Sequence, residues 1–322
     1  MCPLRSDDLR SVELMTTVLV RFAELGLKSE RVRSRFLQQL ADDIEESLIE
    51  EGVEHVMDVR RSRIFIQTGA VKEASDVLRQ VPGVFSFSLV EEAFSEKGAL
   101  MEALSRYGAV RIRKGMTYGL KVRRTGSHPY SSQEIAVEGG GAVISHLKEG
   151  DASVDLKSPD VWIEVEIRER SAYIFDNRTK GMGGMPASSQ GKVLLYLPEH
   201  STGIERRSLL SYTFMRRRGC KVIPAALPDH SGPWTSFLER NRIGGERTPF
   251  ILHGEGIEAS LMDAVSKLRV WGIVLPFGPG VPEGSPVMHA DGTAVSQFYP
   301  TISMSDAEVE EWLERLLGGK LN

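Results

Sequence analysis

A glycine-rich segment divides the chain into two regions whose sequence patterns differ. Residues 181–189 read Gly-Met-Gly-Gly-Met-Pro-Ala-Ser-Ser, a composition typical of a flexible connection. Before this segment, helix and strand patterns are mixed, whereas after it short apolar runs alternate with helical patterns, which favours a parallel sheet. The 322 residues also exceed what one hydrophobic core usually serves, so we expect several domains. We place the linker at residues 181–190.

The first region begins with the pattern of a ferredoxin-like α+β domain, in the order βαββαβ. Its longest helix is indicated by apolar residues at helical spacing, such as Phe36, Leu40 and Ile44. Two strand patterns surround the polar tip Arg60-Arg61-Ser62 and predict a hairpin. The expected strands cover residues 15–22, 53–59, 63–68 and 84–90, and the expected helices cover residues 29–51 and 71–80. We assign residues 1–95 to this domain.

Residues 96–180 are predicted to form a second α+β domain. Ser131 and Glu134 have the Ser-x-x-Glu spacing of a capping box, so a helix should begin there. Three glycines at 139–141 weaken that helix, and we expect close backbone packing or a helix restart at this place. The other expected elements are a helix over residues 98–107, a strand over 117–124, and a hairpin over 161–167 and 171–175.

Positive charge is concentrated in this central domain. The whole chain carries a net charge of -4, yet residues 106–180 contain 13 Lys or Arg against 10 Asp or Glu. The stretch from Arg106 to Arg124 holds seven Lys or Arg and no acid. Phosphate contacts require such clustering, because several cations act together when they displace counterions from a nucleic acid.

Residues 191–322 are predicted to form a small α/β domain. Strands are expected at residues 193–197, 221–227, 249–253 and 271–276, and helices at 204–218, 236–241, 257–268 and 306–317. Residues 278–300 are rich in Gly and Pro, and we expect a long loop there, of a length that is often functional. The regular alternation predicts a parallel sheet with helices on its faces.

The composition excludes several classes of protein. No apolar run approaches the roughly 20 residues that a membrane-spanning helix needs, so we expect no membrane partner. Only two cysteines occur, Cys2 and Cys220, which indicates a reducing cytoplasm rather than a disulfide frame. The seven histidines show no metal-ligand spacing, so we expect no metal site.

An ordered series of motifs runs through the first 197 residues. It consists of VLVRFAELGLK (18–28), YGLKVRR (118–124), HPYSSQE (128–134), VDLKSPD (154–160), VEIRERSAYIF (165–175), and GMGGMP with SSQGKVLLYL (181–197). The series resembles the tRNA 4-thiouridine synthetase (ThiI-type) family. The resemblance implies a THUMP domain over residues 96–180, which together with the ferredoxin-like domain would hold the acceptor region of a tRNA. It also implies that residues 191–322 form a shortened Rossmann-like, adenine nucleotide hydrolase-like domain.

The candidate RNA contacts lie on the central strand and in the loop that follows it. Guanidinium groups can bind phosphates through two hydrogen bonds, and the start of the next helix supplies backbone N–H donors. A basic strand is also often only a solvated edge. The predicted contacts are Lys121, Arg123, Arg124, His128, Tyr130, Ser131 and Ser132. The patch is expected to extend to Arg111, Arg113, Lys114, Arg168, Arg178 and Lys180, each of which is individually more often a plain surface charge.

The turn after Leu197 departs from the pattern of the family. A member of the family would carry Ser-Gly-Gly-Ile-Asp-Ser there, and its glycines let backbone N–H groups surround the phosphates of ATP. Here the turn reads Ser201-Thr202-Gly203-Ile204-Glu205-Arg206, so one glycine, the aspartate and the last serine are replaced. We predict a degenerate PP-loop, with Ser201, Thr202 and Gly203 as the nucleotide contacts and ATP as an uncertain cofactor. A phosphate contact by Arg206-Arg207 is the alternative to a solvated helix start.

No residue stands out as catalytic. Cys220 directly follows Gly219 at the start of an apolar run, so we expect a packed thiol rather than a sulfur carrier. No cysteine follows it in the sequence, and no rhodanese-like extension is expected. Sulfur would therefore come from a separate catalytic or sulfur-donor protein.

Three functions are consistent with these patterns. The first is a tRNA-binding protein that lacks its own ATP-dependent sulfur transfer, and the second is an active ATP-dependent tRNA sulfurtransferase with an unusual nucleotide loop. The third is an α/β scaffold for protein interactions without a role in RNA binding. The first is the hypothesis that the substitutions in the nucleotide loop favour, so whether the chain is an enzyme stays open, with a leaning towards no.

Overall fold

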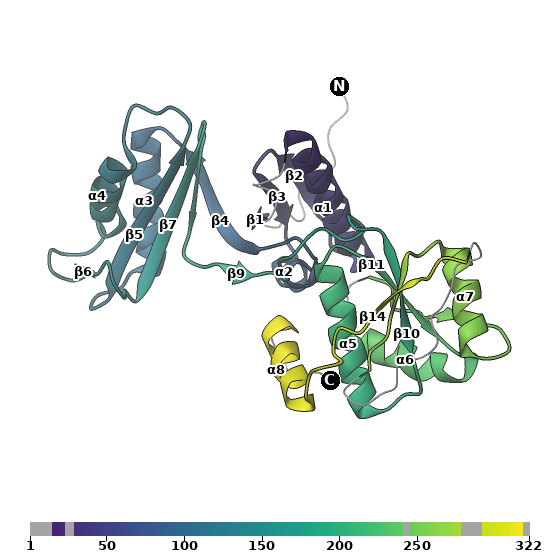
Figure 1. The fold of residues 1–322 in the computed structure, drawn as a ribbon. Coiled ribbons are helices and arrows are strands. Elements are labelled where there is room, and N and C mark those ends of the chain that lie inside the picture. The colour runs from purple at the N-terminus through teal and green to yellow at the C-terminus, as the bar shows by residue number, and fades with distance from the viewer. Residues whose placement is uncertain (1–14, 23–28, 241–244, 278–291, 318–322) are drawn as a thin grey trace, which may run out of the picture. The chain divides into compact units, whose positions relative to one another are not determined.

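The computed structural model describes residues 15–22, 29–240, 245–277 and 292–317 (Figure 1). The chain divides into two compact units, each built from several stretches of sequence. The first comprises residues 1–20, 54–71 and 87–179, and the second comprises residues 21–53, 72–86 and 180–322. Each unit is described below by itself.

The N-terminal elements occur in the predicted order βαββαβ, which confirms the ferredoxin-like pattern. They are β1 (Thr16–Arg21), α1 (Glu30–Glu50), β2 (Val56–Arg60), β3 (Arg63–Thr68), α2 (Val71–Gln80) and β4 (Ser86–Phe94). Strand β3 lies antiparallel between β2 and β1. The predicted hairpin tip at residues 60–62 is therefore present.

Strand β4 connects the ferredoxin-like strands to those of the central domain. Its second half, Glu91–Phe94, pairs antiparallel with Ser171–Ile174 of β8 (Ser171–Phe175). One sheet therefore runs in the order β2-β3-β1-β4-β8-β7-β5-β6, and β9 (Thr179–Lys180) pairs with β4. The central strands are β5 (Thr117–Thr125), β6 (Ser153–Val154) and β7 (Val161–Arg168), and Figure 1 shows the long β4 leading into them.

Helices α3 (Lys97–Arg111) and α4 (Ser132–Val143) cover one face of the central strands. Two glycines bring these helices close. A Cβ atom on Gly108 would lie 1.9 Å from the carbonyl oxygen of Val143, and one on Gly139 would lie 2.8 Å from the side chain of Leu104. Of the three glycines inside α4, only Gly139 therefore serves close packing, since a Cβ atom on Gly140 or Gly141 would meet nothing within 4 Å. The helix continues through the run without a restart.

Alternation along β5 separates an apolar face from a charged one. Tyr118, Leu120 and Val122 pack in the core beneath α3 and α4. Successive side chains of a strand point to opposite faces, so Lys121 and Arg123 lie on the face that these helices leave uncovered. Their register partners on β7 are Glu164 and Glu166, which share that face.

The second unit contains a parallel sheet in the order β12-β11-β10-β13-β14. Its strands are β10 (Lys192–Leu197), β11 (Lys221–Ala226), β12 (Phe250–Ile251), β13 (Gly272–Val274) and β14 (Ser296–Phe298), and its helices are α5 (Thr202–Arg217), α6 (Pro228–Arg240), α7 (Ile257–Leu268) and α8 (Asp306–Leu317). In sequence terms the order is 3-2-1-4-5, the arrangement of a Rossmann-like sheet, in which the strand order reverses beside β10. The predicted fold class is confirmed.

The alternating residues of β10 divide the core of this domain. Val193, Leu195 and Leu197 pack with α5, α6 and α8, whereas Leu194 and Tyr196 pack with α7. These strand residues are buried on both faces, as expected for a central parallel strand.

Two predictions for the C-terminal domain were wrong. Helix α6 begins at Pro228 rather than Ser236, because a proline fits the first turn of a helix and the helix also accommodates Pro233. Residues 296–298, expected within a loop, form β14 beside β13, because a three-residue strand gives too short a pattern to recognise. The remainder of the expected loop, residues 278–291, lies outside the described residues.

No helix among the described residues is both long enough and apolar enough to span a bilayer. In the same part of the chain, no three His, Cys, Asp or Glu side chains gather in a way that would hold a metal ion.

Candidate nucleic-acid interface and nucleotide loop

Three exposed cations lie on β5, with Lys121 at the middle of the strand and Arg123 and Arg124 near the connection to α4. Lys121, Arg123 and Arg124 are exposed, and none of them forms an ion pair with a carboxylate of the described residues. The ammonium group of Lys121 lies 3.4 Å above the ring of Trp162, and Arg124 Nη1 lies 3.5 Å from the carbonyl oxygen of His128. These three cations therefore keep donors that a phosphate can use.

The loop between β5 and α4 contains supporting residues and exposed ones. Tyr130 is buried, and its hydroxyl donates to the backbone carbonyl of Ser95. His128 is half-buried, and its Nε2 lies 2.8 Å from the carbonyl oxygen of Glu169. Tyr130 and His128 thus hold the loop in place, whereas Ser131 is exposed and Ser132 is half-buried at the start of α4.

The predicted capping box at the start of α4 is confirmed. Glu134 N donates to Ser131 Oγ at 3.1 Å, and Ser131 N donates to the carboxylate of Glu134 at 2.5 Å. This backbone hydrogen bond from Ser131 holds the pKa of Glu134 below its usual value. The cap fixes the direction in which α4 leaves the loop, beside the cations of β5.

The structure does not bring Arg111, Arg113 and Lys114 together with this cluster. They precede β5, whereas Arg124 lies near its end, and a nine-residue strand separates the two sites by roughly 25–30 Å. Arg111 Nε lies 2.7 Å from Asp176 Oδ2, and Lys114 Nζ lies 2.9 Å from Asp151 Oδ1. Arg113 is exposed and has no carboxylate partner among the described residues.

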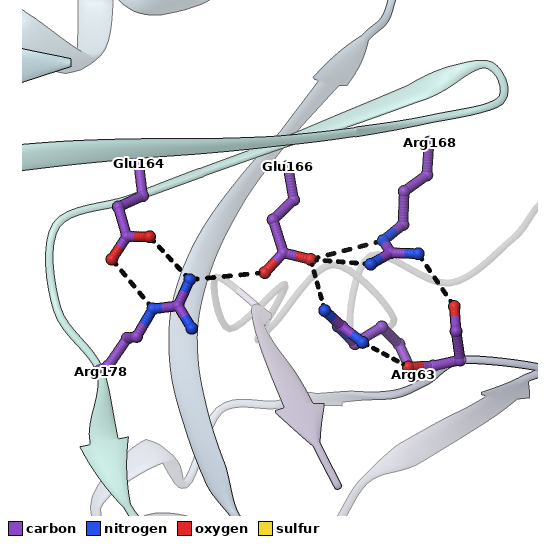
Figure 2. A network of polar contacts seen from close by, with 6 residues as sticks. Arg63, Glu164, Glu166, Arg168 and Arg178 are labelled. Carbon is purple, nitrogen blue, oxygen red and sulfur yellow. Dashed lines mark hydrogen bonds and ion pairs between the residues drawn. The ribbon is translucent and has the colours of Figure 1, made fainter. Parts of the chain in front are cut away.

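Glu166 on β7 holds three arginines around a buried carboxylate, as Figure 2 shows. Its side chain is 3% exposed, and its oxygens lie 2.9 Å from Arg63, 3.2 Å from Arg168 and 3.8 Å from Arg178. Arg178 also binds Glu164 through two hydrogen bonds, of 2.9 and 2.6 Å. These bonds to Glu164 raise the pKa of Arg178.

The network changes the interpretation of two predicted cations. Arg168 and Arg178 were expected to extend the phosphate-binding patch, but their guanidinium groups are bound to carboxylates. Sequence reasoning treated them as surface charges and missed Glu166 and Arg63. The sequence did contain a signal for this network. Glu164, Glu166 and Arg168 are spaced by two residues, which places two acids and a base on one face of a strand.

The predicted nucleotide loop joins β10 to α5, beside the reversal of strand order in the parallel sheet. Ser201, Thr202 and Gly203 are exposed there. Ser201 is the residue before the helix, but its side chain makes no capping hydrogen bond. A Cβ atom on Gly203 would meet nothing within 4 Å, so neither the backbone conformation nor a close contact requires glycine at this position.

Side chains of the protein itself fill the base of this loop. His200 packs edge-on against Trp234, with ring centroids 5.0 Å apart, and the indole N–H of Trp234 donates to the carbonyl of Pro198 at 2.8 Å. His200 Nε2 also lies 2.6 Å from Glu205 Oε1, but the two atoms are not oriented as a hydrogen bond. Glu205 therefore places a carboxylate beside the helix start, where it opposes a phosphate.

The two arginines of the first turn of α5 are bound to the C-terminal segment. Arg206 pairs with Glu310 of α8 at 2.5 Å. Arg207 is buried and donates to the carbonyls of Thr301 and Met304, each at 2.9 Å, and to Asp306 at 2.6 Å. Neither guanidinium group is therefore available to bind a phosphate. The loop could contact the phosphates of ATP only through backbone N–H groups and small hydroxyls. These residues fit a triphosphate poorly.

Cys220 is buried at the start of β11 with 2% of its surface exposed, as expected for a packed thiol. Burial raises the pKa of this thiol. Because the thiolate is the reactive form of cysteine, its position disfavours sulfur transfer.

Comparison with known proteins identifies two domains. Residues 17–88 match the family model of the ThiI ferredoxin-like domain, and residues 100–176 match that of the THUMP domain. A probable tRNA sulfurtransferase of Methanobrevibacter smithii is 32% identical over 223 residues, which are 68% of this chain and 55% of that protein. A probable tRNA sulfurtransferase of Methanothermobacter thermautotrophicus is 30% identical over 249 residues, which are 76% of this chain and 60% of that protein. The chain thus spans somewhat over half the length of these curated relatives.

Two solved structures share the fold. The protein PH1313 of Pyrococcus horikoshii superposes with a TM-score of 0.73 at 26% identity, covering 94% of this chain and 99% of that one. A 4-thiouridine synthetase, solved as a complex with RNA and bound ATP, superposes with a TM-score of 0.68 at 18% identity, covering 94% of this chain and 85% of that one. At this identity the second likeness shows a common fold.

Proposed function

The chain is a relative of the tRNA sulfurtransferases with a ThiI ferredoxin-like domain and a THUMP domain, and from this premise we propose that it binds the acceptor region of tRNA without carrying out ATP-dependent sulfur transfer by itself. The observation that carries the proposal is that β5 bears three exposed cations without a carboxylate partner among the described residues: Lys121 at its middle, and Arg123 and Arg124 close to the loop before α4. A sulfur-donor or catalytic protein of the cytoplasm would supply the missing chemistry.

The distribution of paired and unpaired cations supports this site. Six cations of the same domain lie within 4.0 Å of a carboxylate oxygen: Lys97, Arg106, Arg111, Lys114, Arg168 and Arg178. Each of these loses part of its attraction for an added phosphate. Lys121, Arg123 and Arg124 on β5 keep theirs, as does the separate Arg113, and the adjacent pair Arg123 and Arg124 would draw an RNA backbone to the end of β5.

The absence of sulfur transfer is supported by the loop after β10. Arg206 and Arg207 are bound to α8 and the segment before it, and Glu205 adds negative charge where a triphosphate would lie. Catalysis of nucleotide chemistry needs preorganised positive groups or a cation at the phosphates. The described residues of the loop provide no free arginine or lysine for that role.

An active ATP-dependent tRNA sulfurtransferase is the alternative function. The observation that favours it is the position of Ser201–Gly203: the segment is exposed at a helix N-terminus, at the reversal of strand order where Rossmann-like sheets bind ligands. The backbone N–H groups there would contact phosphates, and binding of tRNA would have to rearrange the loop.

Equilibrium binding of a fluorescent tRNA tests the RNA site. The double variant Arg123→Glu/Arg124→Glu should weaken the binding of many tRNAs together, by at least about tenfold, and should lower the slope of log K against log salt by about two. The matched control is Lys72→Glu/Lys267→Glu, which makes the same change of charge at exposed lysines of α2 and α7. Equal weakening in both variants, or an affinity that does not respond to salt, would reject the site.

Titration of Mg-ATP separates the two functions. Calorimetry in the presence and absence of tRNA should show no binding, and tRNA with ATP should release no pyrophosphate. Release of pyrophosphate that disappears in Thr202→Trp would establish the alternative, because a bulky side chain at this position blocks the loop.

A further inference from the structure

A cavity lies at the end of the parallel sheet opposite to the nucleotide loop. It has a volume of about 380 Å³ and is lined at the start of β11, at the last turns of α5, by one face of α1 and by residues 245–248. Because β10 and β11 are parallel, this position is at the amino end of the strands, whereas the nucleotide loop follows the carboxyl end. Nothing in the proposed RNA function uses it.

The wall of the cavity contributed by α5 carries a buried cation. Arg216 is 6% exposed, and its guanidinium group makes no hydrogen bond or ion pair with the described residues. It lies 5.6 Å from the ring of Tyr212, which is also buried. Because no described residue accepts a hydrogen bond from this guanidinium, its N–H donors are open to a ligand in the cavity.

The wall contributed by α1 carries the opposite charge. Asp43, Glu46 and Glu50 lie three to seven residues apart, on one face of the helix, and all line the cavity. Asp43 Oδ1 accepts a hydrogen bond of 3.0 Å from Gln39, but Oδ2 is buried without a partner. Asp43 and Arg216 attract each other, yet no hydrogen bond or ion pair joins them.

The other charges around the cavity are largely neutralised. Lys221 Nζ lies 3.7 Å from Glu246, and Arg247 is paired with Glu51. What remains is one buried guanidinium facing a row of carboxylates. A ligand that satisfies both walls must therefore present an acceptor to Arg216 and a donor to Asp43 at the same time.

We propose that this cavity binds a small zwitterion of the α-amino-acid class, with its carboxylate on Arg216 and its ammonium group on Asp43. A carboxylate matches a guanidinium through two parallel hydrogen bonds, and an ammonium group offers three donors to carboxylate oxygens. A lone anion would face the three acids of α1, and a lone cation would leave Arg216 unpaired. The zwitterion satisfies both.

The size and charge of the cavity narrow the ligand further. A volume of about 380 Å³ leaves room beyond an α-amino and an α-carboxyl group. Glu46 and Glu50 continue the acidic wall past Asp43 and would receive a second cation. A basic amino acid such as lysine or arginine therefore fits better than a neutral one.

Thermal shift and calorimetry with L-lysine and two truncated analogues test the proposal on the full chain. L-Lysine should bind and raise the melting temperature. Cadaverine lacks the carboxylate and should bind at least about tenfold more weakly, as should hexanoate, which keeps the carboxylate but lacks both amines. Binding of cadaverine that equals that of lysine would show a plain cation site and overturn the proposal, and so would the absence of binding by L-lysine and L-arginine.

Substitutions test whether Arg216 and Asp43 bind the ligand. Arg216→Met and Asp43→Asn should each weaken L-lysine binding about ten- to hundredfold. Arg218→Met is the matched control, because Arg218 is exposed at the end of α5 and does not line this cavity. Undiminished binding by a folded Asp43→Asn protein would overturn the assignment even if Arg216→Met failed to fold. Because tRNA affinity is measured on the same samples, loss of one function is distinguishable from loss of the other.

Discussion

Arg63 on β3 and Glu166 on β7 are 103 residues apart in the sequence, and their side chains form an ion pair of 2.9 Å. The contact joins the hairpin of the ferredoxin-like domain to a strand of the THUMP domain. Arg168 adds a second link, because its guanidinium donates to Ser62 Oγ at 3.0 Å as well as to Glu166. The sheet shared through β4 and this network together hold the strands β2 and β3 to the strands of the THUMP domain within the first unit.

Replacement of Glu166 by Gln should destabilise the first unit strongly. The carboxylate is 3% exposed, and its loss leaves Arg63 and Arg168 partly buried without a carboxylate partner among the described residues, whereas Arg178 keeps Glu164. Breaking a buried ion pair in this way costs about 3–5 kcal/mol. Urea unfolding followed by tyrosine and tryptophan fluorescence measures the effect.

Glu138→Gln is the control for this substitution, since Glu138 pairs with Lys97 at an exposed site. Exposed pairs contribute little, so this variant should unfold like the parent protein. If Glu166→Gln unfolded at the same urea concentration as the control, the network would not stabilise the contact between the domains.

Tyr130→Phe should lower stability while leaving tRNA affinity unchanged. The substitution removes the hydroxyl that donates to the carbonyl of Ser95 and leaves a buried acceptor without its partner, a loss of about 1–2 kcal/mol. The ring is buried, so RNA does not contact it directly. Thermal melting and tRNA binding well below the melting temperature check both parts. A stable variant with weakened RNA binding would instead make Tyr130 a direct contact.

Local patterns in the sequence predicted most of the fold. The alternation of β10, the helical spacing of α1 and the Ser131 to Glu134 cap each depend on neighbouring residues, and the structure contains all three. The run of three residues that forms β14 was missed, because its strand character comes from pairing with β13 rather than from its own pattern.

The partners of charged side chains could not be predicted in the same way. Arg123 and Arg168 look alike in the sequence, but one is exposed and the other is bound to Glu166. That difference depends on which residue lies opposite in a sheet whose strands come from distant parts of the chain. The burial of Arg216 could not be predicted for the same reason, because it arises only when α5 packs beside residues 245–248.

Asp43 should make stability depend on pH. Burial raises the pKa of its carboxyl to about 6, an effect that Glu46 increases and that Gln39, the backbone of Ala187 and Arg216 oppose. The unfolded chain has the usual pKa near 3.9, so the folded state binds more protons between pH ~4 and ~6. The free energy of unfolding therefore falls as pH rises through this window, by at most about 3 kcal/mol, and is flat above it.

Urea unfolding of the parent and of Asp43→Asn across this range isolates the contribution. The asparagine cannot titrate, so the difference between the two curves should show the fall and then level off. Asp42→Asn, at the exposed neighbouring position, should keep the parental dependence. A parent curve that rises where this one is expected to fall would mean that Arg216 outweighs desolvation.

Arg207→Met distinguishes a structural arginine from a phosphate ligand at the nucleotide loop. The side chain donates to the carbonyls of Thr301 and Met304, and its loss should cost about 2–3 kcal/mol and speed hydrogen exchange of the amides just after these residues. Arg206→Met removes only a half-exposed pair with Glu310 and should change stability little. An arginine that bound phosphate would behave in the opposite way, since its removal would leave stability intact and abolish an affinity for ATP that the parent protein possessed.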